Sequence, residues 1–138
     1  MRTIAVAIAI LATLAACATH GPTDSQRLAM YMSHAGEPVN QVRYFSPQGW
    51  DRIDDQHIVL TMRPREQYLL TLSGPCLQWS TGMPVIGIQT TMGTVISRFD
   101  RITANGSPMS CSIQEIRPLD AAGVREGEKA LRAQASGR

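Results

Sequence analysis

The stretch HIVLTMRPREQYLLTL, residues 57–72, decides the fold of this chain. Its outer parts, HIVLTM and QYLLTL, are rich in branched apolar and aromatic side chains, and RPRE between them carries the proline and charges of an exposed turn. These residues predict an antiparallel β-hairpin. Leu69 and Leu70 point to opposite faces of the second strand, so both of its faces are partly apolar. Such a strand is expected inside a barrel or sandwich rather than at an exposed edge.

Turn signals divide the residues on either side of the hairpin into further short strands. The turns are marked by Pro47-Gln48-Gly49, Met92-Gly93 and Asn105-Gly106, and the predicted strands are residues 39–45, 85–90, 94–99, 101–104 and 109–116. The sequence therefore predicts a mainly β fold, a small barrel or roll of about six short antiparallel strands. The pattern leaves open whether the sheet closes, rolls up or stays open.

One N-terminal helix is predicted before the strands. Leu28 and Met32 recur at a helical interval, Asp24 or Ser25 can serve as the N-cap, and Gly36 follows the last periodic residue. We expect a helix of about ten residues, which is an ordinary length for a globular domain.

The remaining chain is divided by composition. Residues 25–119 are predicted to form a single β-rich domain. Residues 120–138 are rich in alanine, glycine and charge, with little to bury, which predicts a flexible or frayed-helical tail.

The first sixteen residues predict an export signal. Arg2 precedes an apolar run over residues 4–16, which as a helix would be about 20 Å long, against about 30 Å for the hydrocarbon core of a bilayer. The run is therefore too short for a membrane span, and a positive start followed by a short apolar stretch is typical of a secretory signal.

Leu14-Ala15-Ala16-Cys17 resembles the lipobox of bacterial lipoproteins. The resemblance implies cleavage before Cys17 and lipidation of this residue, with acyl chains such as palmitate as the membrane anchor. Ala18 rather than aspartate follows Cys17, which in the resembling class implies sorting to the outer membrane. An ordinary signal peptide cut after an A-x-A triplet is the alternative. Residues 17–24 would then be a polar tether.

Cys76 and Cys111 are the only thiols left if Cys17 carries lipid. In an oxidising periplasm two remaining thiols predict a disulfide. A redox or metal pair is the alternative, but neither cysteine lies in a C-x-x-C motif or beside a cluster of histidines and acids.

Charge excludes one class of partner. The formal net charge of +2 falls to +1 when Arg2 leaves with the signal, and no basic run remains. The chain therefore lacks the electrostatic footprint of a nucleic-acid-binding protein, and the one membrane contact that we expect is the lipid on Cys17.

Several short motifs together resemble a family of small proteobacterial envelope lipoproteins that is known as a domain of unknown function. The motifs are Trp50 with Asp54-Asp55, Tyr68-Leu69-Leu70-x-Leu72, Cys76, Phe99-Asp100-x-Ile102 and Cys111-x-Ile113-x-x-Ile116. The resemblance covers about residues 39–119. It implies an envelope location and paired cysteines, and it implies no mechanism.

Acidic and histidine side chains supply the polar candidates for a site. Asp54, Asp55 and His57 lie close together before a strand and could hold a cation or form an acid/base pair, whereas a solvated turn that bonds its own backbone is the plainer interpretation. Asp100 is either a ligand contact or a turn cap. His20 and His34 are far from His57 in sequence and not at metal-ligand spacing, so we expect neither a metal nor another cofactor.

Two tryptophans supply the apolar candidates. Trp50 and Trp79 could line a ligand groove, or they could be core or barrel-lid residues. No G-x-S-x-G elbow and no free cysteine nucleophile are present, which makes a hydrolase a weak interpretation.

The sequence thus leaves two classes of function. The first is a non-catalytic lipoprotein, anchored in the outer membrane and facing the periplasm, that binds an envelope protein or has a structural role. The second is a small-ligand carrier or enzyme with its site at the barrel mouth near Trp50 and His57.

Overall fold

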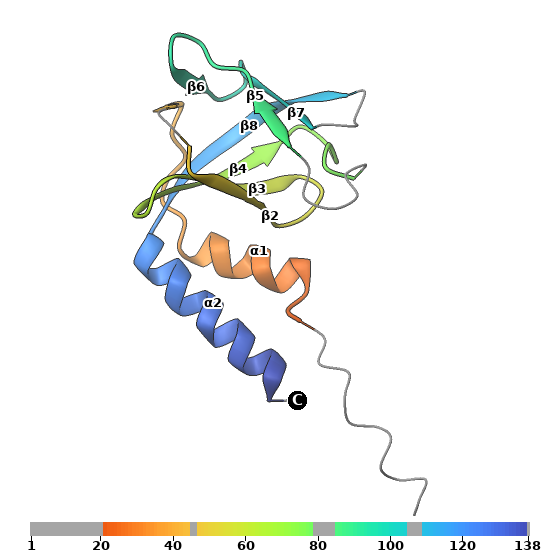
Figure 1. Ribbon diagram of the computed structural model, residues 1–138, viewed down its shortest axis with the longest axis vertical. Helices are drawn as coiled ribbons and strands as arrows, with labels where there is room; N and C mark the ends of the chain where they lie inside the picture. The colour runs from red at the N-terminus through yellow and green to blue at the C-terminus, as the bar shows by residue number, and fades with distance from the viewer. Residues whose placement is uncertain (1–20, 45–46, 79–84, 105–108, 138) are drawn as a thin grey trace, which may run out of the picture.

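The computed structural model describes residues 21–44, 47–78, 85–104 and 109–137 (Figure 1). It confirms the predicted hairpin: β3 (His57–Arg63) and β4 (Glu66–Leu72) pair antiparallel, with a register shift between Thr61 and Arg63. The hairpin lies within a six-stranded antiparallel sheet of order β2-β3-β4-β8-β7-β5. The other strands of this sheet are β2 (Gly49–Arg52), β5 (Ile86–Ile88), β7 (Arg101–Ala104) and β8 (Ser110–Leu119).

A separate two-stranded sheet pairs β1 (Gln41–Arg43) with β6 (Thr94–Ile96). The larger sheet curls into a half-barrel, and a mainly β fold of short antiparallel strands is confirmed (Figure 1). The described residues form eight strands rather than about six; each predicted strand segment contains one of them, and β2 is the strand that was not predicted. The strands on either side of the Met92-Gly93 turn form as predicted but pair with different partners, β5 with β7 and β6 with β1.

Two hydrophobic cores lie on opposite faces of the hairpin. Leu70 and Leu72 of β4 are buried inside the curl, whereas Leu69 is buried on the other face, beneath the helices. The core inside the curl also contains the side chains Val42, Ile58, Leu60, Met62, Cys76, Leu77, Val95, Ile102, Ala104, Cys111, Ile113 and Ile116. The expectation that both faces of this strand are covered is confirmed.

The N-terminal helix is confirmed as α1 (Asp24–Ser33). Its N-cap is Thr23, not Asp24 or Ser25: the Thr23 hydroxyl accepts from the amide of Gln26 at 3.2 Å, and the Gln26 side chain accepts from the amide of Thr23 at 2.9 Å. This reciprocal capping box satisfies two amides that a helix start otherwise leaves unpaired, which explains why the helix begins one residue earlier.

Residues 121–136 form a second helix, α2 (Ala121–Ser136), where the sequence predicts a flexible or frayed-helical tail. Asp120 caps this helix by accepting from the amide of Ala122 at 3.1 Å, and Val124 is buried against the helix-side core. The two helices cover the convex face of the sheet together (Figure 1). No helix of the described residues is long and apolar enough to cross a membrane.

The predicted disulfide is confirmed. Cys76, just after β4, is bonded to Cys111 in β8, with 6.0 Å between their Cα atoms. Cys111 is also opposite Ile102 in the β7–β8 ladder, so the bridge fixes the end of the curl that lies away from the helices.

Candidate binding site

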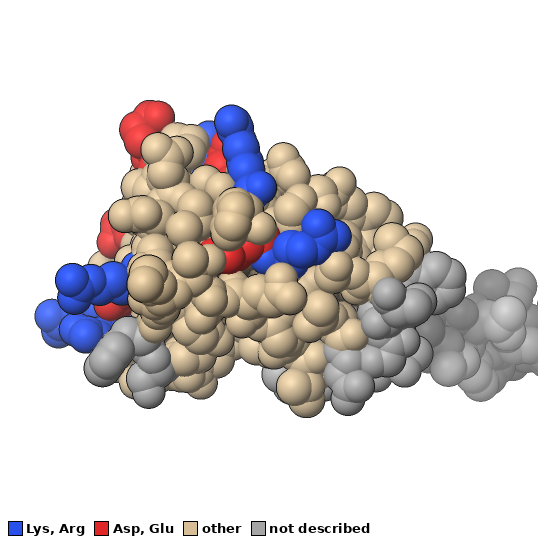
Figure 2. Space-filling view, turned by 90° about the horizontal axis from the view of Figure 1, so that it is seen from above, with Lys and Arg blue, Asp and Glu red and all other residues tan. Residues whose placement is uncertain are grey.

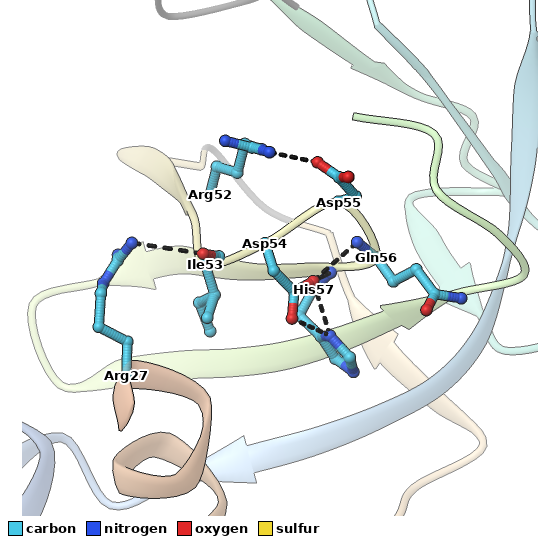
Figure 3. A network of polar contacts seen from close by, with 7 residues as sticks. All are labelled: Arg27, Arg52, Ile53, Asp54, Asp55, Gln56 and His57. Carbon is cyan, nitrogen blue, oxygen red and sulfur yellow. Dashed lines mark hydrogen bonds and ion pairs between the residues drawn. The ribbon is translucent and has the colours of Figure 1, made fainter. Parts of the chain in front are cut away.

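The Asp54-Asp55-His57 cluster forms the turn between β2 and β3 (Figure 3). Asp54 Oδ1 accepts from the amides of Gln56 at 2.7 Å and His57 at 2.8 Å, and His57 Nδ1 lies 2.8 Å from the same carboxylate. Asp55 forms an ion pair with Arg52. The Asp54 carboxylate is therefore occupied by its own turn, which supports the plainer interpretation of this cluster.

Asp100 is a turn cap. It is only 4% exposed, its Oδ2 accepts from the amide of Ile96 at 2.6 Å, and its Oδ1 accepts from the Thr91 hydroxyl at 3.1 Å. Both carboxylate oxygens are thus used inside the protein. Asp100 joins the turn before β6 to the turn after it, so its role in any binding site is to position these two turns.

Trp50 lines an apolar slot between the two edge strands of the six-stranded sheet. The slot has a volume of about 150 Å³, and its other walls are Tyr44, Pro47, Gln48, Gly49, Leu60, Ile86 and Ile88. It joins β2 to β5, the first and last strands in the order of the sheet. Trp50 is partly buried against the inner core, so it is both a wall of the slot and a part of the packing.

Large apolar side chains project from the same end of the molecule. Met92 is 99% exposed, and Phe99 is 70% exposed. We call Met92 and Phe99, with the exposed Arg98 between them in sequence, the apolar tip. Figure 2 looks down on this end and shows that most of its surface carries neither acidic nor basic side chains. Exposed apolar side chains that gather at one end of a domain often mark an interaction site.

Hydrogen bonds connect the apolar tip to the slot. The amide of Tyr44, a wall of the slot, donates to the carbonyl of Gly93 at 2.8 Å, next to Met92. The backbone φ angle is 52° at Met92 and 64° at Arg98, a left-handed conformation that residues other than glycine rarely adopt. The end of the curl therefore presents a strained backbone beside an apolar slot.

The remaining predicted residues are placed as follows. Cys17 and Trp79 lie outside the described residues, and so do the predicted signal peptide and the Asn105-Gly106 turn. Nowhere in the described ranges does a group of three or more histidine, cysteine, aspartate or glutamate side chains come together in a way that could hold a metal ion. Of the predicted contacts that lie within the described ranges, Trp50 is the one that lines the slot.

The apolar tip was missed by sequence reasoning. Met92 was interpreted as part of a turn, and the one local signal was that a methionine stands where tight turns prefer asparagine or glycine. Phe99 was interpreted as the end of a strand, but β6 ends at Ile96 and leaves the ring in solvent.

Comparisons with known proteins point to one family. No curated protein matches the chain, and no solved structure matches it. A family model described as a family of unknown function, DUF6491, matches residues 1–135, nearly the whole sequence. The chain therefore belongs to this family of unknown function.

Proposed function

We propose that this protein is a non-catalytic lipoprotein of the outer membrane, acylated at Cys17, which binds a partner protein on its periplasmic side. The partner docks at the slot and the apolar tip. The observation that carries the proposal is the pairing of a small apolar slot with exposed apolar side chains at one end of the domain.

The size of the slot favours a protein over a small ligand. Its volume of about 150 Å³ is below the roughly 300–1,000 Å³ of most small-molecule sites. A slot of this size holds one large apolar side chain, and buried anchor residues of this kind carry most of the energy of protein interfaces.

The charges near the slot indicate an acidic partner segment. Among residues 85–104 the basic residues, Arg98 and Arg101, are both exposed, and the one acid, Asp100, is buried. Among the described residues, the Arg101 guanidinium bonds to the hydroxyl and carbonyl of Ser110, and neither of these groups neutralises its charge. A partner that places aspartate or glutamate beside an apolar anchor would match this surface.

The proposed anchor directs the docking end away from the membrane. The described chain starts at Gly21, on the helix side of the molecule (Figure 1). The slot is lined by Trp50 and Leu60, which pack with the core on the other face of the sheet. Cys17 precedes Gly21 by four residues, which at full extension span about 14 Å. A lipid on Cys17 would hold the helices toward the bilayer and leave the slot facing the periplasm.

Mass spectrometry of the mature protein tests the anchor. We expect a first residue Cys17 that carries a diacylglyceryl group, and we expect Cys17→Ser to remove both the lipid and the cleavage. A mature chain that starts elsewhere without lipid would refute the anchor.

Site-specific photo-crosslinking in cells tests the docking end. A photoreactive residue at position 99 should yield one discrete protein adduct, and the same residue at position 129, on the exposed face of α2, should not. Arg98→Glu should abolish the adduct, whereas Arg125→Glu, the matched charge reversal on α2, should leave it intact. An adduct that survives Arg98→Glu, or a small molecule that copurifies in place of a protein, would contradict the proposal.

A further inference from the structure

A second cavity lies on the helix side of the molecule, between α1, α2 and β2. Its volume is about 320 Å³, and it is lined by Pro22, Arg27, Met30, Tyr31, Asp51, Glu128, Leu131 and Arg132. Unlike the slot, it is as large as ordinary small-molecule sites and its walls are mostly polar.

Four charged side chains line this cavity, and two of them, Arg27 and Asp51, form no ion pair with a described residue. Arg27 reaches from α1 to the carbonyl of Ile53 at 3.4 Å, a neutral partner (Figure 3). The Asp51 backbone pairs with Val59 in the β2–β3 ladder, but its carboxylate forms neither a hydrogen bond nor an ion pair with another described residue, and it borders the same space. Beside the Arg132–Glu128 ion pair, the cavity therefore offers one cation and one anion for a bound group to pair with.

The rest of the wall is fixed. Tyr31 is buried, and its hydroxyl donates to Glu128 Oε1 at 2.7 Å. Arg132 lies 3.4 Å from the other oxygen of Glu128, a long contact that leaves its remaining N–H donors available. Arg27 and Arg132 thus supply guanidinium donors, which suit phosphate, while Asp51 supplies a carboxylate, which suits an ammonium group.

We propose that the cavity between the helices binds a zwitterionic phosphoethanolamine group, with the phosphate on Arg27 and Arg132 and the ammonium on Asp51. A lipid headgroup and a soluble phosphoethanolamine ester share this chemistry. Pro22 lines the cavity, so the site lies five residues from Cys17. The lipid source rests on the proposed acylation, whereas the ligand chemistry does not.

Glycerophosphoethanolamine is the first probe. It is titrated into the full chain in maltoside micelles, and NMR signals of the amides and arginine Nε groups are followed. We expect the signals of Arg27 and Tyr31 to shift. Glycerophosphate and ethanolamine each offer half of the ligand and should bind at least about tenfold more weakly, since each loses one charge-assisted contact. Glycerophosphocholine should also be weaker, because its methylated ammonium cannot donate to Asp51.

Matched variants test which residues bind the phosphoethanolamine group. Arg27→Gln and Asp51→Asn should each weaken binding about tenfold or more, whereas Arg125→Gln on α2 and Glu37→Gln, both exposed outside the cavity, should not. The Asp51 carboxylate has no hydrogen bond or ion pair with a described residue to lose, so Asp51→Asn remains informative if Arg27→Gln fails to fold. Three results would overturn the proposal: both variants bind glycerophosphoethanolamine as tightly as the parent chain, glycerophosphate binds as tightly as glycerophosphoethanolamine, or the NMR signals of the cavity residues do not shift.

Nanodiscs distinguish the two sources of the phosphoethanolamine group, a lipid headgroup and a soluble ester. The full chain in phosphatidylethanolamine nanodiscs should show the same Arg27 shift, which phosphatidylcholine nanodiscs should not produce. Binding of the soluble ester without the nanodisc shift would support the site and assign a soluble ester to it. Crosslinking at position 99 does not depend on this cavity, so failure here and failure of the proposed partner binding are distinguishable.

Discussion

Replacing Gly123 and Gly127 together by alanine should destabilise this protein, although alanine is the better helix former. The two glycines are four residues apart in α2, on the face that α1 approaches. A Cβ atom at Gly123 would lie 2.4 Å from His34 Nδ1, and one at Gly127 would lie 2.7 Å from Met30 Cγ. Both distances are far shorter than a van der Waals contact, so these side chains must shift or the two helices must separate.

The size of the effect follows from two opposing contributions. Alanine in place of glycine in a helix gains about 0.5–1 kcal/mol at each position, because glycine loses more backbone freedom on folding. Overpacking a tight contact costs about 1–3 kcal/mol at each position. The opposing contributions leave a net loss of about 2 kcal/mol for the double variant. Met30 is flexible and can yield more readily than the His34 ring, so Gly123→Ala should account for most of the loss.

Urea unfolding of the full chain measures this balance. Ala130→Gly, at an exposed position of α2, reports the helix-propensity contribution alone and should cost about 0.5–1 kcal/mol. Met30→Ala in the Gly127→Ala background should show a coupling free energy of about 1 kcal/mol, since it removes the atoms that clash. A double variant that is more stable than the parent would refute the close packing of the helices and restore the interpretation of residues 120–138 as a tail.

Four further outcomes follow from the structure. Replacing Cys76 and Cys111 by serine opens a loop of 35 residues and should cost about 4 kcal/mol in urea unfolding, and a loss below about 1 kcal/mol would contradict the chain-entropy reasoning. Met92→Asn relieves a left-handed methionine and should raise the free energy of unfolding by about 1 kcal/mol while weakening the proposed crosslink; lower stability would argue against the strained turn. Asp100→Ala removes both acceptors of a buried carboxylate and should cost about 2–3 kcal/mol, with the tip amides losing protection from hydrogen exchange first; uniform loss across the sheet would speak against a local cap. Burial and the hydrogen bond to Glu128 raise the pKa of Tyr31, so above about pH 10 the unfolded chain loses this proton while the folded chain keeps it, and stability should fall as the pH rises, with a shallower slope in Tyr31→Phe.

Local patterns predicted the hairpin because its strands and turn are contiguous in the sequence. The alternation at Leu69 and Leu70 correctly predicted two covered faces, since side chains of a strand point to opposite sides wherever the strand lies. The disulfide followed from counting cysteines, which depends on chemistry and not on strand order. These features required no knowledge of distant contacts.

The second helix could not be predicted from apolar periodicity. Gly123 and Gly127 form the face of α2 that packs against α1. Glycine has no side chain, so it contributes nothing to a pattern of apolar side chains. The two glycines allow α1 and α2 to approach each other closely, so that α2 packs with few buried side chains, of which Val124 is the main apolar one. A sequence test for small residues four apart would have found this face.

The slot and the apolar tip depend on pairings between distant strands. Trp50 faces Ile86 and Ile88 only because β2 and β5 are the two ends of one curled sheet, an order that no local motif encodes. The exposure of Met92 depends likewise on the pairing of β6 with β1 across more than fifty residues of sequence. Sequence reasoning therefore identified Trp50 as a candidate without its partners.

The disulfide and Asp100 both hold the same end of the molecule together. Cys111 lies opposite Ile102 in the β7–β8 ladder, and β7 follows directly after Asp100. The amide of Ile113 donates to the carbonyl of Asp100 at 3.0 Å, which ties the cap to β8 two residues beyond the bridge. The proposed docking end is made of left-handed turns and short strands that each contribute one or two side chains to the inner core, such as Val42 of β1 and Val95 of β6. An end of this kind would open first in solution, and a covalent bridge next to a buried cap would keep it ordered for the proposed partner while burying little further surface.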